Sequence, residues 1–208
     1  VWADFSGKKG GFLSSDVENE YKNRGKEMIK RVMNHPGPIA KLAVKIKMDL
    51  PYFWLSEEEN IILCGKIDWL EYYPDMDGVN IIDFKTGKGF ENSESLQLPI
   101  YNLLVMNCQP RKICRASYWY LGQSDEPVEV SLPDIEESRD KILKMARNVK
   151  VARKLERFKC EHEGGCMYCK PMESIIRGEA EFVGADSFNQ DVYILEQDAN
   201  KMPDSEIL

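Results

Sequence analysis

The stretch of residues 63–101 decides the fold, and its sequence is LCGKIDWLEYYPDMDGVNIIDFKTGKGFENSESLQLPIY. Within it, residues 79–85 are rich in apolar and β-branched side chains, which predicts a short buried strand, and the polar, glycine-rich residues 86–89 end that strand. Because side chains alternate along a strand, Asp83 and Lys85 face the same way. The stretch therefore places a carboxylate and an amine on one face at the end of a strand.

A second strand is predicted just upstream, over residues 61–70, and the turn residues 74–78 join the two strands as a hairpin. This pairing can bring Asp68 beside Asp83. Two carboxylates that converge at a strand end form a hard-oxygen site suited to Mg²⁺ or Mn²⁺. Lys85 stands about 6–7 Å along the same face, where it can hold an attacking water or stabilise charge on a phosphate.

Three motifs follow one another in this region: GKID at 65–68, IDFKTGK at 82–88 and QLPIY at 97–101. In this order they resemble the RecB-type branch of the PD-(D/E)XK nuclease superfamily, over roughly residues 20–170. The resemblance implies an α/β, restriction-endonuclease-like fold with a mixed central sheet flanked by helices and a small cysteine-rich C-terminal lobe. It also implies a nuclease activity.

The resemblance assigns roles to residues as well. In this family the first aspartate and the Asp-x-Lys pair bind metal and activate water, and the helix with the Gln-x₃-Tyr pair faces the metal and the bound strand. Carried over by position, the catalytic set is Asp68, Asp83, Lys85, Gln97 and Tyr101. The Mg²⁺ or Mn²⁺ ligands are Asp68, Asp83 and the carbonyl of Phe84. The open alternative is that Tyr101 is a core residue and Gln97 a helix-cap partner.

Family members also carry an acidic residue or a histidine on their first helix. The matching stretch here has no histidine, so Glu27, with Glu20 in reserve, is the candidate for that position. An exposed helix glutamate with no catalytic role is an equal interpretation of either residue.

The leading functional hypothesis is a Mg²⁺- or Mn²⁺-dependent DNA nuclease, and more narrowly an exonuclease in DNA repair or recombination. The formal net charge of −7 argues against a protein that coats nucleic acid by bulk electrostatics. The segment 134–158 is nevertheless rich in lysine and arginine and is a candidate nucleic-acid face. The alternatives are a non-catalytic nuclease-like module that binds DNA or docks a helicase, and a zinc-held interaction protein.

Cys160, His162, Cys166 and Cys169 form a C-x-H-x₃-C-x₂-C pattern. These ligand types at this spacing are typical of a tetrahedral zinc site. The resemblance implies a [4Fe–4S] cluster as an alternative, because several RecB-type nucleases hold one with three late cysteines and one far upstream. This sequence, however, has no cysteine before Cys64 that could be the upstream ligand. Free thiols in a reducing compartment are the third possibility.

With 208 residues and 43% hydrophobic composition, the sequence favours one sizeable core. We expect a nuclease core over 1–157, with 1–15 as a partly ordered lead-in, and a cysteine-containing lobe and tail over 158–208. No apolar run approaches a membrane span and no signal peptide opens the sequence, so we expect a cytoplasmic protein. The opening without Met suggests a fragment of a longer polypeptide.

Outside the central stretch, apolar periodicity predicts further elements. We expect helices over 15–33, 94–106 and 134–158, strands over 40–49, 116–121 and 128–132, and a hairpin over 178–184 and 191–195.

Overall fold

The computed structural model describes residues 2–92, 94–160, 162–186 and 188–195. The chain forms two compact units. One unit is Glu27–Glu156, and the other combines Val1–Lys26 with Arg157–Leu208. The first helix, α1 (Ser15–Asn34), contributes residues to both.

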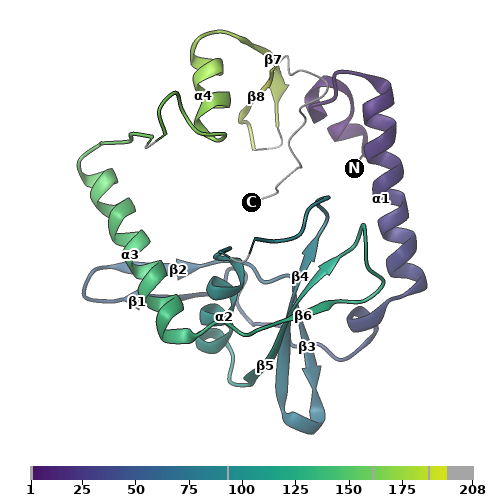
Figure 1. The fold of residues 1–208 in the computed structure, drawn as a ribbon, viewed down its shortest axis with the longest axis vertical. Helices are drawn as coiled ribbons and strands as arrows, with labels where there is room; N and C mark the ends of the chain where they lie inside the picture. Colours follow the sequence, from purple (N-terminus) through teal and green to yellow (C-terminus); the bar gives the residue numbers. More distant parts are fainter. Residues whose placement is uncertain (1, 93, 161, 187, 196–208) are drawn as a thin grey trace. The chain divides into compact units, whose positions relative to one another are not determined.

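The unit Glu27–Glu156 is built on a four-stranded mixed sheet (Figure 1). Its strands are β3 (Trp69–Tyr73), β4 (Gly78–Lys85), β5 (Lys112–Tyr120) and β6 (Val128–Val130). They lie side by side in this order, with β4 parallel to β5 and the other two pairings antiparallel. The expected mixed α/β architecture is therefore confirmed.

The strand β4 is the most deeply buried element of the sheet. Residues 78–83 are all buried, and Val79, Ile81 and Ile82 have 0% exposure. A strand covered on both faces needs no alternation of polar and apolar residues, which explains its apolar run. Parallel pairing of β4 with β5 requires a crossover, and α2 (Gln97–Cys108) supplies it and packs on β5.

A two-stranded sheet packs beside α2 in the same unit. It consists of β1 (Tyr52–Ser56) and β2 (Ile61–Cys64), and α3 (Ile135–Lys154) packs on β1 and α2. The core that these elements share includes Leu55, Ile61, Leu103 and Ile142. α3 begins after Asp134, whose side chain accepts a hydrogen bond from the Glu137 N–H at 2.8 Å and so caps the helix.

The prediction of one continuous strand over 61–70 is wrong. Its first part, β2, pairs with β1, whereas its last residues begin β3 and pair with β4. The chain leaves the strand conformation between them, over residues 65–68. A Cβ at Gly65 would lie 3.1 Å from the Leu104 side chain, so glycine lets the backbone pass close to α2 where it moves from one sheet to the other.

The strand predicted over 40–49 is also wrong. This segment makes a single bridge, Ala43 to Glu71, flanked by hydrogen bonds from Val44 N–H to the Leu70 carbonyl and from Tyr72 N–H to the carbonyl of residue 42. The alternating pattern arises because Val44 and neighbouring apolar residues pack against the core, although the backbone lies along β3 only briefly.

The other predicted elements are confirmed with shifted ends. α1, α2 and α3 correspond to the three expected helices, and β5, β6 and the hairpin of β7 (Ala180–Ala185) with β8 (Asp191–Leu195) to the expected strands. Among the α-helices and strands of the described residues, two were not expected from the sequence. They are β1, whose pairing with β2 depends on a four-residue turn, and the short helix α4 (Cys169–Ile176).

The unit made by the two ends of the chain holds α4, the β7–β8 hairpin and two short 3₁₀ turns at the N-terminus. The Trp2 indole donates a hydrogen bond to Glu18 Oε1 at 2.9 Å, and Lys8 pairs with Glu181 at 2.6 Å. None of the helices in the described ranges is long and apolar enough to cross a membrane.

Candidate active site

A group of polar side chains gathers where β4 extends beyond its neighbour. β3 pairs with β4 only as far as Trp69 opposite Ile82, so the last residues of β4 have no strand partner on that edge. Asp68, directly before β3, fills the gap, because its Oδ2 accepts a hydrogen bond from the Phe84 N–H at 3.0 Å. The start of one strand thereby places an exposed carboxylate beside the end of another.

Asp83 is the buried member of this group, with 1% of its side chain exposed. Its Oδ1 accepts a hydrogen bond from Gln97 Nε2 at 2.6 Å. Burial raises the pKa of Asp83 to about 6 against the opposing effect of Lys85, and the charge of Asp68 raises it further. The two carboxyl groups therefore lie close enough to interact.

The Oδ2 atom of Asp83 is incompletely satisfied. The ammonium of Lys85 lies 3.0 Å away, yet among the described residues no donor reaches this buried oxygen with hydrogen-bond geometry. Buried carboxylate oxygens without a donor are rare in folded proteins and call for an explanation such as an ion. A divalent cation shared with Asp68 fits this atom in charge and in ligand type.

Lys85 stands between two carboxylates, Asp83 and Glu91, with 18% of its side chain exposed. It also donates to the Gln97 side-chain oxygen. Burial opposes the charged amine, but the interactions of Lys85 with the Glu91 and Asp83 carboxylates outweigh it, so the pKa of Lys85 is raised. Lys85 is therefore a fixed positive charge at the edge of the site.

Gln97 and Tyr101 occupy one face of the first turns of α2, four residues apart. The Gln97 amide donates to Asp83 and, at 3.3 Å, to Tyr101 Oη, and it accepts from Lys85. Burial raises the pKa of Tyr101, against the effect of Gln97, and the charges of Asp68 and Asp83 add to the rise. One amide thus connects Asp83, Lys85 and Tyr101.

Glu91 belongs to the same group, although sequence reasoning did not single it out. It lies in the loop between β4 and α2, its N–H donates to Tyr120 Oη at 3.1 Å, and its carboxylate pairs with Lys85. Burial raises the pKa of Glu91, but the hydrogen bonds from Lys85 and Ser95 outweigh this and hold it below its usual value. The only sequence signal was an acidic residue in a polar loop expected to border the site.

Two further residues of the predicted set do not bring a side chain to this group. Glu27 is exposed on α1, where it pairs with Lys30 at 2.6 Å, and none of its described contacts involves Asp68, Asp83 or Lys85. Phe84 contributes only its backbone. Because the N–H and C=O of a strand residue point to the same edge, the Phe84 carbonyl lies on the edge where its N–H meets Asp68.

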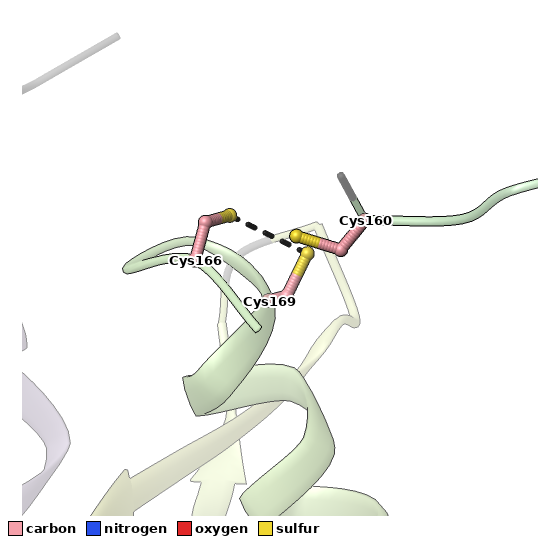
Figure 2. A group of neighbouring side chains, drawn as sticks. All are labelled: Cys160, Cys166 and Cys169. Atoms are coloured by element: carbon pink, nitrogen blue, oxygen red, sulfur yellow. Dashed lines mark hydrogen bonds between the residues drawn. The ribbon is translucent and has the colours of Figure 1, made fainter. Parts of the chain in front are cut away.

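The cysteines form a separate group in the unit made by the chain ends. The Sγ atoms of Cys160, Cys166 and Cys169 all lie within 4.8 Å of one another and point toward a common centre (Figure 2). Gly164 and Gly165 both have positive φ, near 80°, which lets the backbone turn back just before Cys166. Three converging thiols are suited to a thiophilic metal or cluster.

Hydrogen bonding within this group gives Cys166 and Cys169 different pKa values. Cys166 Sγ lies 3.5 Å from Cys169 Sγ. Hydrogen bonds from the Cys169 backbone and thiol lower the pKa of Cys166 to about 7, and that of Cys169 rises to about 11. The imidazole of His162 is exposed and lies outside the group of mutually close ligand atoms in the described residues.

The sequence matches the model of a family described as the PD-(D/E)XK nuclease superfamily over residues 12–173. The match includes the whole four-stranded sheet, the side chains gathered around Asp83 and the three cysteines. No match to a curated protein or to a solved structure was found.

Proposed function

The chain belongs to the PD-(D/E)XK nuclease superfamily, and from that membership we propose that it hydrolyses phosphodiester bonds in DNA with Mg²⁺ or Mn²⁺. The observation that carries the proposal is the pair of carboxylates, in which buried Asp83 lies beside Asp68 and its Oδ2 has only an ion pair with Lys85. Burying a carboxylate is costly, and Lys85 offsets only part of that cost, because burial still raises the pKa of Asp83. A metal ligand accounts for both facts.

Asp68, Asp83 and the Phe84 carbonyl would hold the ion. When bound, a divalent cation lowers the pKa of a water ligand and neutralises charge that develops on the phosphate. Lys85 would orient the attacking water by hydrogen bonding and stabilise the phosphate oxygens. Gln97 would fix the orientation of both Asp83 and Lys85, and Tyr101 would donate to the substrate from the same helix face. Glu27 remains the candidate acidic residue of the first helix.

We further propose an exonuclease of the RecB-type branch that acts in DNA repair or recombination in the cytoplasm, with a helicase as a partner. The order of the three motifs, from Gly65 to Tyr101, supports the branch assignment. The thiols of Cys160, Cys166 and Cys169 would hold Zn²⁺ or a [4Fe–4S] cluster and stabilise their loop without taking part in hydrolysis.

The test is cleavage of end-labelled linear DNA and of a circular single strand with Mg²⁺, Mn²⁺ or EDTA. Asp83→Ala should abolish cleavage, and Lys85→Ala should lower its rate about 10²–10³-fold. Matched controls are Asp75→Ala and Lys112→Ala, an exposed acid and an exposed base outside the site, which should leave the rate unchanged. Cleavage that survives Asp83→Ala contradicts the proposed site, and rapid cleavage of the circle contradicts an exonuclease.

A non-catalytic DNA-binding or helicase-docking module is the second candidate. One observation favours it: Lys85 is already paired with both Asp83 and Glu91, so a substrate has to compete for its ammonium. Binding of DNA without cleavage under every metal condition would support this module over the enzyme.

A further inference from the structure

The ammonium of Lys85 is already occupied in the free protein, and one of its partners comes from a loop. It lies between the carboxylates of Asp83 and Glu91 and donates to the side-chain oxygen of Gln97. An ammonium has three N–H donors, and here three oxygens lie beside it. A water or a phosphate oxygen therefore has to compete with one of these oxygens for Lys85.

The charge balance of the site also opposes a phosphate as long as Glu91 stays in place. Three carboxylates, those of Asp68, Asp83 and Glu91, surround the single positive charge of Lys85. A divalent cation on Asp68 and Asp83 would bring the sum of these charges to zero, which leaves no net attraction for an anion. The sum becomes positive only when the Glu91 carboxylate moves away.

Of the three oxygens beside Lys85, the one from Glu91 belongs to the side chain that can leave most easily. Asp83 lies on β4 with 1% of its side chain exposed, and Gln97 is held on α2 by its hydrogen bond to Asp83 at 2.6 Å. Glu91 lies between β4 and α2, where the described residues form neither helix nor strand. Its side chain is 22% exposed, so a change of rotamer brings the carboxylate to water.

The loop itself is held by contacts that do not involve the Glu91 carboxylate. The Glu91 N–H donates to Tyr120 Oη at 3.1 Å, and the Phe90 ring lies edge-on to the Tyr120 ring with 4.9 Å between the centroids. Gln123 Nε2 donates to the Lys88 carbonyl at 2.7 Å. The Glu91 side chain can therefore rotate away while the backbone of the loop stays in place.

We infer that Glu91 is a positioning residue that holds the Lys85 ammonium in the free protein and releases it to a phosphate group of the substrate. Glu91 acts through Lys85 and does not touch the reacting atoms. Because the site binds phosphate only in the fraction of molecules in which Lys85 is released, Glu91 weakens the apparent affinity for DNA. The inference rests on the proposed function, in which a phosphate meets Lys85.

The test compares two substitutions that remove the same charge from the same loop. Glu91→Gln keeps the shape of the side chain, and Glu94→Gln is the matched control, an exposed acid that is not among the partners of Lys85. Each substitution is made in the full chain, alone and together with Lys85→Ala. Binding of a fluorescent single-stranded oligonucleotide is measured by anisotropy in Ca²⁺, with a gel to check that the DNA stays intact, and KM and kcat are measured for Mg²⁺-dependent cleavage.

Glu91→Gln should bind the oligonucleotide about tenfold more tightly than the wild type, because the phosphate no longer competes with a charged hydrogen-bond partner. KM should fall by a similar factor while kcat stays within about twofold, since Glu91 has left Lys85 before the chemical step. Glu94→Gln should change either constant by less than about twofold. In the Lys85→Ala background Glu91→Gln should have no effect. Glu91→Asp, which keeps the charge, should bind DNA more like the wild type.

Three results would overturn the inference. They are equal binding by Glu91→Gln and the wild type, an equal gain from Glu94→Gln or in the Lys85→Ala background, and a fall in kcat at unchanged KM, which would mean that Glu91 stays on Lys85 during the reaction. The proposed nuclease fails separately. A wild-type protein that cleaves no DNA but whose binding tightens as expected loses the proposed catalysis and keeps the role of Glu91, whereas cleavage without any tightening has the opposite meaning.

Discussion

Asp83→Asn should make the metal-free protein more stable at neutral pH while it destroys the proposed metal site. Burial raises the pKa of Asp83 from 3.8 to about 6, so the ionised carboxylate is less favourable in the folded chain than in the unfolded one. At 1.36 kcal/mol for each pKa unit, the folded protein loses about 3 kcal/mol when this group ionises. Asparagine resembles the protonated acid in shape and is never charged.

The sign of the pH dependence follows from the raised pKa. Below 3.8 the carboxyl is protonated in both states and destabilises nothing; as pH rises through the interval from 3.8 to about 6, stability is lost. The loss amounts to about 1 kcal/mol at pH 4.5 and reaches its full value above about pH 7. The advantage of Asp83→Asn over the wild type should follow the same curve.

The assay is thermal unfolding in EDTA at pH 4.5 and pH 7.5, followed by circular dichroism. For a chain of this length, 3 kcal/mol corresponds to a rise in Tm of about 6–12 °C at pH 7.5, and the rise should shrink to about a third at pH 4.5. Added Mg²⁺ should stabilise the wild type by about 2.7 kcal/mol at a hundred times its Kd and leave Asp83→Asn unchanged. Asp68→Asn is the control, since this carboxylate is exposed and its loss should not raise Tm comparably.

Two outcomes would refute the reasoning. If Asp83→Asn gains no stability at pH 7.5, the buried carboxylate is not a net cost in the metal-free fold. If the gain is the same at both pH values, its origin is packing rather than ionisation of Asp83.

Three further predictions concern other parts of the molecule. Glu91→Gln removes the first partner that raises the pKa of Lys85, so the alkaline limb of the pH–rate profile should move to lower pH; an unchanged limb would show that Glu91 does not tune the amine. Cys166→Ser should lose bound zinc or iron in elemental analysis while Mg²⁺-dependent cleavage persists, and Cys64→Ser, an exposed thiol of β2, should retain the metal; equal metal content in both would contradict the cysteine site. Gly78→Ala should destabilise the fold by roughly 1–3 kcal/mol in denaturant titration, because its Cβ would lie 2.1 Å from a neighbouring sulfur; a stability equal to wild type would mean that β4 and β5 can separate at no cost.

The part of the fold that sequence patterns captured is the part governed by local rules. The apolar run of β4, the turn before it and the helix after it follow from periodicity and turn chemistry alone. The gathering of Asp68, Asp83, Lys85, Gln97 and Tyr101 was then predictable from three motifs in order.

The predictions were wrong or incomplete where contacts between distant segments decide the structure, because the local sequence is compatible with more than one conformation. Residues 61–70 have the composition of one strand, and only the competing partners β1 and β4 divide it. Glu91 was missed because it is one acid among several in a polar loop, and its role depends on the position of Lys85. α4 was not predicted because its 8 residues are too few for apolar periodicity to indicate a helix.

Because the pairing of β3 with β4 ends opposite Ile82, insertions and deletions in the turn between these strands should be poorly tolerated. The amide that meets Asp68 is available only because β3 stops opposite Ile82. A single residue gained or lost in the turn at 74–77 would slide one strand past the other and turn every side chain of the slipped strand to the opposite face. Length variation at this tight connection should therefore be as damaging as replacing an acid, although the turn itself lies at the far end of the hairpin from the carboxylates.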